Sequence, residues 1–177
     1  MNLPCTPIST TNFAPYGSLV STADGSGTAV NEGRGLRFET AASLVHKTAT
    51  TQPKLALYKI SGSKWPVKVR ILERHCHSAQ LFLPMAGGAF LVVVARPAVT
   101  GEPEMDSLAA FLCEQGQGIV YAPGIWHLPL VAIGQSADFA MLMWENGTQD
   151  DCEEHLMAIT LTVHAPQGAK ISQGAKI

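Results

Sequence analysis

The chain has 177 residues, of which 46% are hydrophobic and 15% are charged, and its formal net charge at pH 7 is −2. This length predicts one domain with a substantial core, and the apolar content excludes a disordered chain. The near-neutral charge gives no electrostatic footprint for nucleic acid or for an anionic membrane surface, and no apolar run approaches the length of a membrane span.

The N-terminus and the cysteines bear on the cellular compartment. The opening residues, MNLPCTPISTTNF, lack the basic-then-apolar profile of a secretory signal. The four cysteines include no C-x-x-C pair, and in a domain of this size we expect reduced thiols and not a disulfide framework. We therefore expect a cytoplasmic protein.

Glycines and prolines separate short apolar runs along the chain, which is typical of an all-β sandwich or barrel. A turn is expected near residues 11–16, and the polar, glycine-rich stretch from Asn12 to Thr40 predicts a long loop that is mobile or functional. The run Ala89–Ala95 is apolar on both faces and predicts a strand covered on both sides. The expected strands are Leu55–Ile60, Val67–Glu73, Leu81–Leu83, Ala89–Ala95, Ala109–Cys113, Gly118–Tyr121, Trp126–Ile133 and Phe139–Trp144.

Towards the C-terminus, one helix is expected over Asp150–Ala158, because acidic residues suit a helix N-terminus. The pentapeptide QGAKI then occurs twice, which is too short a repeat to be structural. We expect a single domain over residues 1–160 and a tail over residues 161–177 outside the fold.

The stretch from Glu73 to Gln80, ERHCHSAQ, gathers ionisable side chains at the end of an expected strand. Alternation along a strand places Glu73, His75 and His77 on one face, continuous with the aliphatic Val69. Such a face is expected where a barrel strand leaves the core and meets a pocket. A metal site, an acid–base site and a solvated strand end all fit this stretch by itself.

A second histidine, His127, follows Trp126 in the apolar segment GIWHLPL. A lone histidine in such a strand is a hydrogen-bonded core residue or a ligand, and the presence of two such segments favours a shared site. Together the segments resemble the two motifs of the cupin barrel, through His75-x-His77 with Gly87 and through Gly118, Pro123 and His127. Cupins carry a Glu near the position of Gln80, and a neutral amide is a poorer metal ligand than a carboxylate.

A closer resemblance is to the ureidoglycolate lyase family, formerly called ureidoglycolate hydrolases. The pattern is ERH-x4-Q-x-F-x-P-x-x-G followed by QG-x-x-Y-x-x-x-x-WH-x-PL, and weaker matches extend it over residues 5–157. The matching residues are Glu73, Arg74, His75, Gln80, Phe82, Pro84, Gly87, Phe90, Gln117, Gly118, Tyr121, Trp126, His127 and Pro129.

This resemblance implies an all-β fold, a cupin-like double-stranded β-helix barrel with minor peripheral helices, in a homodimer. It implies cleavage of ureidoglycolate into glyoxylate and urea in the allantoin branch of purine catabolism. The expected partner is this small-molecule substrate, with no nucleic acid, no membrane and no organic cofactor.

The reaction needs a base for the hydroxyl proton, an acid for the departing urea nitrogen and a cation for the carboxylate. The expected proton-transfer residues are His127, His75 and Glu73, without assignment of acid and base. The expected binding residues are Arg37 or Lys59 for the carboxylate and Gln80, Asn31 and Tyr121 for the urea amides.

A divalent metal (Ni, Zn or Mn) is the alternative source of catalysis. We expect its ligands to be His75, His77, Gln80 and His127, and the ion would act as a Lewis acid on the carbinol oxygen. Two other functions stay open from the residues: a metal-dependent cupin oxygenase or isomerase, and a non-catalytic cupin that binds a small acid.

Overall fold

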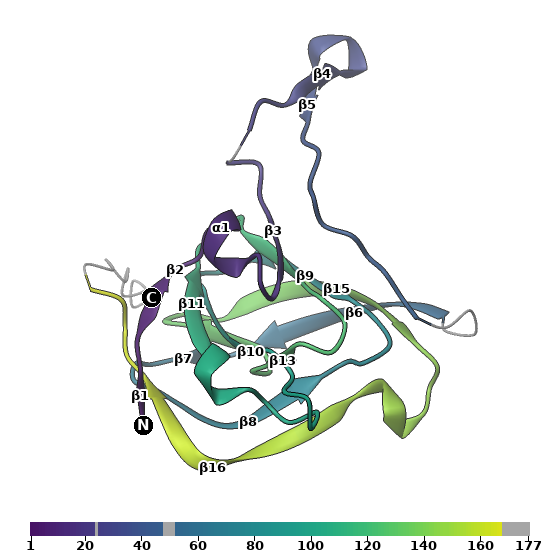
Figure 1. Ribbon diagram of the computed structural model, residues 1–177. Helices are drawn as coiled ribbons and strands as arrows, with labels where there is room; N and C mark the ends of the chain where they lie inside the picture. Colours follow the sequence, from purple (N-terminus) through teal and green to yellow (C-terminus); the bar gives the residue numbers. More distant parts are fainter. Residues whose placement is uncertain (24, 48–51, 168–177) are drawn as a thin grey trace.

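The computed structural model describes residues 1–23, 25–47 and 52–167. These residues form two β-sheets and a separate hairpin, with one short α-helix and three 3-10 turns (Figure 1). The strands are β1 Asn2–Leu3, β2 Cys5–Pro7, β3 Gly17–Val20, β4 Thr28–Val30, β5 Gly35–Arg37, β6 Gln52–Ile60, β7 Gly62–Ser63, β8 Val67–Arg74, β9 Gln80–Ala86, β10 Phe90–Ala95, β11 Ala109–Cys113, β12 Gly118–Tyr121, β13 Trp126–His127, β14 Val131–Ile133, β15 Ala137–Glu145 and β16 Glu153–Val163. The helical elements are α1 Thr10–Phe13, η1 Asn31–Gly33, η2 Met105–Ser107 and η3 Gln149–Asp151.

The larger sheet has the order β1-β16-β8-β13-β10-β11-β2, with β14 and β7 continuing beside β10. The smaller sheet has the order β3-β12-β9-β15-β6. Because β1 and β2 are separated only by Pro4 and pair with opposite ends of the larger sheet, that sheet curls back on itself. The expected all-β, cupin-like barrel with minor helices is confirmed.

Strand β10 separates two hydrophobic cores. Phe90, Val92 and Val94 face the core between the two sheets, whereas Leu91 and Val93 face a second core enclosed by the larger sheet. All six residues of β10 are buried, as expected for a strand that is apolar on both faces. The first core adjoins the site described below.

The expected strands are all present, but several differ in extent. Strands β6, β9 and β15 are each three or more residues longer than expected, and the expected strand Trp126–Ile133 is interrupted at residues 128–130. Pro129 lies in this interruption, and a proline has no N–H to donate to a strand ladder. The chain therefore resumes pairing with β10 only at Val131.

The expected helix Asp150–Ala158 is wrong. A single 3-10 turn ends at Asp151, and the chain then forms β16, which pairs antiparallel with β8. A bulge after Leu156 resets the register, and Leu161 and Val163 become fully buried in the second core. Pairing with a neighbouring strand thus overrides the local acidic signal. The expected domain end at residue 160 falls inside this strand, and residues 168–177 with the QGAKI repeat lie outside the described residues.

The expected loop from Asn12 to Thr40 contains regular structure. Strand β3 pairs with β12, and β4 pairs with β5 in a hairpin that projects from the barrel (Figure 1). We call residues 25–47, which include this hairpin, the arm. None of the helices in the described part of the chain has the length and apolar character needed to cross a membrane.

Burial of the last strand predicts a large effect of Leu161→Ala on stability. We expect a loss of about 2–5 kcal/mol in the free energy of unfolding, because the substitution leaves a cavity in the second core. Thr160→Ala, at an exposed neighbour, should change it by less than about 0.5 kcal/mol. Urea denaturation measures both variants, and equal midpoints would contradict a role of residues beyond 160 in the fold.

Candidate active site

The site begins with a cross-strand pair between β8 and β13. Glu73 and His127 lie opposite each other in the ladder, and both side chains face the core between the sheets. Nε2 of His127 lies 3.5 Å from Oε1 of Glu73. The histidine side chain is 2% exposed and that of the glutamate 22%, so the pair is largely shielded from water.

The ring of His127 is fixed in orientation from two sides. Its Nδ1–H donates to the carbonyl of Ile125 over 2.9 Å, and Tyr121 stacks on the ring with centroids 4.1 Å apart and planes inclined by 14°. Because a carbonyl only accepts, this hydrogen bond assigns the proton to Nδ1 and leaves Nε2 facing the glutamate. Nε2 makes no hydrogen bond among the described atoms, since the contact with Glu73 is longer than one.

His75 presents the same arrangement from just beyond the end of β8. Its Nδ1–H donates to the carbonyl of Asp151 over 2.6 Å, and its buried Nε2 has no hydrogen-bond partner among the described residues. The rings of His75 and His127 are 5.4 Å apart. Two imidazole nitrogens with available lone pairs therefore converge near one carboxylate.

Glu73 and His75 open on a cavity of about 380 Å³, a volume suited to a small metabolite, and His127 lies beside Glu73 outside the lining. The buried Gln80, which opens β9, also lines it, with an Oε1 that has no partner among the described residues. The cavity is lined by Tyr58, Ile60, Glu73, His75, Gln80, Phe82, Pro129, Leu130, Met141, Met143, Glu145 and Cys152.

Burial and the neighbouring charges set the ionisation of the site. Burial raises the pKa of Glu73, but the interaction with His127 and the positive charges available on His127 and His75 outweigh it, and the pKa is lowered. For His75, burial and the proximity of His127 lower the pKa, and the hydrogen bond to Asp151 offsets this only in part. At neutral pH the site thus contains a carboxylate beside a neutral His75.

The donor set also fits a divalent metal ion. Ligand atoms of Glu73, His75 and His127 all lie within 4.8 Å of one another. Both histidines donate Nδ1–H to a backbone carbonyl, the outer-shell contact that orients metal-binding imidazoles. Two imidazoles and one carboxylate suit Zn, Ni, Mn or Fe.

This cluster differs from the expected ligand set of His75, His77, Gln80 and His127. It contains Glu73, whereas His77 is not part of the group and does not line the cavity. Alternation of side chains holds only within β8, which ends at Arg74, and the chain bends before His77. The expected alternation is also broken within β8, because Val69 and Leu72, three residues apart, both face the second core.

Arg74 and Trp126 follow or precede the site residues Glu73 and His127 in the chain, and they point to the other face of the larger sheet. Arg74 forms a two-nitrogen contact with Glu153 at 2.6 and 3.1 Å and donates to the carbonyl of Gly101. Its guanidinium lies 4.5 Å from the ring centroid of Trp126, whose Nε1–H reaches the same carbonyl. These residues stabilise the strands that hold the site, a role that the sequence motif did not distinguish from chemistry.

The expected binding residues are only partly brought together. Gln80 lines the cavity, and Tyr121 lies behind His127 and supports its ring. Arg37 and Asn31 lie on the exposed arm, and neither lines the cavity. Lys59 points to the outer face of the smaller sheet and pairs with Asp138 at 2.8 Å.

Three polar residues of the cavity were missed from the sequence: Tyr58, Glu145 and Cys152. Tyr58 belongs to an expected strand, so its alternation with Ile60 was a signal that went unused. Glu145 and Cys152 flank the turn that was expected to open a helix, and only the folded chain brings them to the cavity.

A small cavity beside two buried histidines and a carboxylate in a cupin-like barrel defines a site for acid–base or metal-assisted catalysis on a small molecule. The family model described as ureidoglycolate lyase matches residues 1–164, and the chain belongs to this family. It is 32% identical over 149 residues to the ureidoglycolate lyase of Pseudomonas fluorescens, covering 84% of this chain and 87% of that protein. It is also 32% identical to the ureidoglycolate lyase of Burkholderia cepacia, over 80% of this chain and 78% of the other.

Solved structures with a similar arrangement of strands are more distant. A dTDP sugar isomerase from Desulfovibrio desulfuricans is 17% identical, with a TM-score of 0.43 over 77% of this chain and 83% of that one. A dTDP-6-deoxy-D-glucose-3,5-epimerase from Legionella pneumophila is 14% identical, with a TM-score of 0.42 over 56% of this chain and 51% of the other. Because these TM-scores are low, the fold is assigned from the strand order of the two sheets.

The cluster predicts which substitutions weaken the binding of a divalent metal ion. If the protein binds Zn²⁺, Ni²⁺ or Mn²⁺, Glu73→Gln and His75→Ala should each weaken binding at least about tenfold, whereas His77→Ala should not. Isothermal titration of the chelator-treated protein measures this. A loss of binding in His77→Ala equal to that in His75→Ala would restore the ligand set expected from the sequence.

Cys152 lines the cavity, but its ionisation argues against covalent catalysis. Burial and the charges of Glu73, Glu154 and Glu153 raise the pKa of the thiol to about 11. At neutral pH we expect iodoacetamide to modify Cys152 about 100-fold more slowly than a thiol with a pKa of 9, because only the thiolate reacts. Peptide mass spectrometry over time measures the rate, and fast alkylation would contradict the shift.

Proposed function

We propose that this protein is a ureidoglycolate lyase that releases glyoxylate and urea in purine catabolism. The observation that carries the proposal is the Glu73–His127 pair beside the free Nε2 of His75, inside a small cavity of a chain that belongs to this family. Family membership favours this reaction over a cupin oxygenase or isomerase, and over a cupin that only binds a small acid.

The reaction transfers a proton within the substrate as its carbon–nitrogen bond breaks. The carbinol hydroxyl loses its proton and becomes the aldehyde of glyoxylate, while the urea nitrogen leaves with the bonding electron pair and gains a proton. Urea is a poor leaving group as an anion, so protonation of this nitrogen is the step most in need of help. Acid and base assistance are each typically worth about 10²–10⁴-fold.

The ionisation of the site supports separate roles for the two histidines. The pKa of His75 is lowered, which favours a neutral ring whose Nε2 accepts the hydroxyl proton. We assign the proton that the departing nitrogen gains to Nε2 of His127, which lies 3.5 Å from the carboxylate of Glu73. Gln80 is positioned to accept a hydrogen bond from the urea amide through its unpaired Oε1.

A resident divalent ion is compatible with this proposal. Glu73, His75 and His127 would hold it, and the ion would supply Lewis-acid polarisation of the carbinol oxygen. In that case Gln80 and Glu145 remain the polar groups of the cavity that orient the urea end of the substrate.

We also propose that the enzyme is a cytoplasmic homodimer. The cysteines at positions 5, 76, 113 and 152 are free, in keeping with a reducing compartment. The projecting arm and the exposed Leu55 and Leu57 of β6 offer surface for a second chain.

Release of urea and glyoxylate from each enantiomer of ureidoglycolate, with and without chelator, tests the function. The wild type should exceed the spontaneous breakdown of one enantiomer. His127→Gln and Glu73→Gln should lower kcat by about 10²–10⁴-fold with a smaller change in KM, because they act on proton transfer. His77→Gln is the matched control and should keep wild-type kcat, since His77 does not line the cavity. Release no faster than background from both enantiomers would sink the proposal.

A further inference from the structure

The cavity of a single chain lacks one group that the proposed reaction requires. Among the described residues, its lining contains the carboxylates of Glu73 and Glu145 but no Lys or Arg. A substrate carboxylate in this cavity would lie near two like charges without a cation to offset them. The nearby cation Lys54 is 60% exposed and lies at the rim, where it contacts Glu145 at 3.6 Å.

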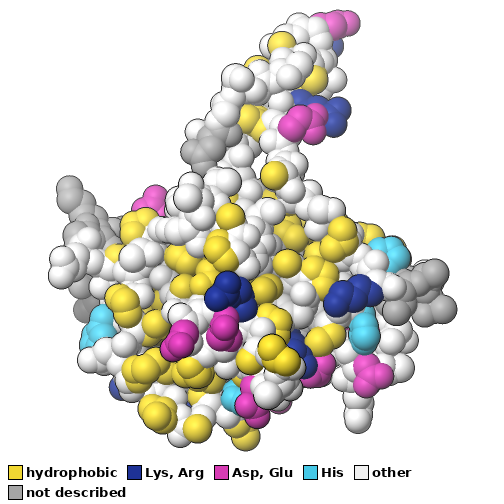
Figure 2. All heavy atoms as spheres, viewed as in Figure 1, with side chains coloured by type: hydrophobic (Ala, Val, Ile, Leu, Met, Phe, Trp, Pro, Cys, Tyr) yellow, Lys and Arg dark blue, Asp and Glu magenta, His cyan; other side chains and the backbone are white. Residues whose placement is uncertain are grey.

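The arm carries two exposed arginines whose ion pairs lie within the arm itself. The side chains of Arg34 and Arg37 are 77% and 68% exposed, and each pairs with a glutamate on the arm, Glu32 or Glu39. In Figure 2 the charged side chains of the arm lie well away from the barrel. Exposed pairs of this kind contribute little to stability, so they do not explain why the arm carries them.

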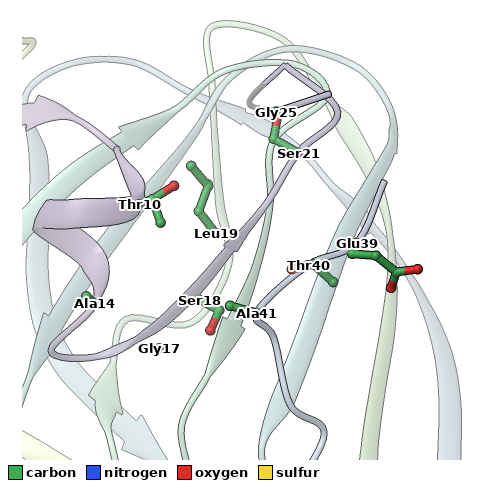
Figure 3. Close-up of a pocket in the computed structure, with 10 residues that line it drawn as sticks. All are labelled: Thr10, Ala14, Gly17, Ser18, Leu19, Ser21, Gly25, Glu39, Thr40 and Ala41. Carbon is green, nitrogen blue, oxygen red and sulfur yellow. The ribbon is translucent and has the colours of Figure 1, made fainter. Parts of the chain in front are cut away.

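The base of the arm is hydrogen-bonded to its own barrel at Val45 and Lys47, whereas its hairpin projects away from the barrel. Strands β4 and β5 form a two-stranded sheet of their own, and an isolated hairpin is marginal in water. Leu36 is 62% exposed on it, and a hollow of about 550 Å³ separates the base of the arm from α1 and β3. Figure 3 shows this hollow between Leu19 and Ser18 on β3 and Thr40 on the segment that follows β5. The backbone of Asn31 and Glu32, at the tip, is left-handed, a strained conformation that often marks functional sites.

One rim of the cavity offers a complementary surface. Strand β6 ends the smaller sheet, and its outward Leu55 and Leu57 are each 69% exposed. The alternate residues Tyr58 and Ile60 of the same strand line the cavity. Long apolar edge strands promote association unless something covers them, so a strand laid along β6 would cover these leucines and reach the cavity.

We propose that the arm of a second copy of this chain lies against β6 and supplies Arg37 to the carboxylate of the substrate. This proposal rests on the proposed function, because the substrate carboxylate is what calls for the cation. We assign the arm to a second copy of the same protein because each chain carries both an arm and an unpaired edge strand β6. In a two-fold dimer, the arm of each chain can lie against β6 of the other. The planar guanidinium suits bidentate recognition of a carboxylate, which a lysine at the rim does not provide.

Mixed dimers test whether the arginine acts across subunits. Arg37→Ala should raise KM at least about tenfold with little change in kcat, whereas Lys54→Ala should leave KM within about threefold of wild type. Dimers with one Arg37→Ala chain and one His127→Gln chain, purified through two different tags, should regain about half of the wild-type kcat/KM, because one of the two sites is intact. A mixed dimer no more active than its parents, or an increase in KM confined to Lys54→Ala, would overturn the proposal.

A cross-linking experiment separates this proposal from the identity of the substrate. In a Cys152→Ser background, a short bismaleimide should join Arg37→Cys in one chain to Leu57→Cys in another, giving a covalent dimer, because Leu57 is exposed on β6, where the arm is proposed to lie. Arg37→Cys without Leu57→Cys in the same background is the matched control and should stay uncrosslinked. If ureidoglycolate is not turned over but this dimer forms, the proposed function fails and the arm proposal stands. If no cross-link forms in an active enzyme, the arm proposal fails alone.

Discussion

The pairing of Glu73 with His127 across β8 and β13 is the constraint on which the site depends. One register position places a carboxylate 3.5 Å from an imidazole inside the barrel. Because side chains alternate, the same register sends Arg74 and Trp126 to the opposite face, where they stack and share the carbonyl of Gly101. A register slip of one residue would send Arg74 and Trp126 towards the cavity and Glu73 and His127 away from it. The contacts of Arg74 and Trp126 therefore help to fix the register that the site requires.

The buried position of the histidines gives the site its chemical character. Both rings are fixed by hydrogen bonds from Nδ1–H to backbone carbonyls, and both Nε2 atoms face the interior. Unpaired polar atoms in an apolar setting are costly, and they persist where a ligand completes them. The same two atoms and the neighbouring carboxylate serve proton transfer or a metal ion, which explains why cupin-like barrels support both kinds of chemistry without a change of fold.

Much of the barrel could be predicted from local patterns. Alternation and the uninterrupted apolar run of β10 predicted strands that the structure contains, and the two histidine motifs predicted that distant segments meet. The helix expected at Asp150–Ala158 shows the limit of such patterns. Its acidic start forms only one turn, because pairing with β8 and burial of Leu161 and Val163 stabilise a strand there.

The sequence alone determined the all-β class and the family, and it singled out Glu73, His75, Gln80 and His127 as site candidates, because strand periodicity and short motifs are local properties of the chain. Only the tertiary structure decided that Glu73 and not His77 completes the cluster, and that Glu145 and Cys152 enter the cavity. It also placed Arg37 on a projecting arm and Lys59 on an outer face, outside the cavity of their own chain. These outcomes depend on where a strand ends and which strand pairs with it, and pairing between distant segments has no local signature.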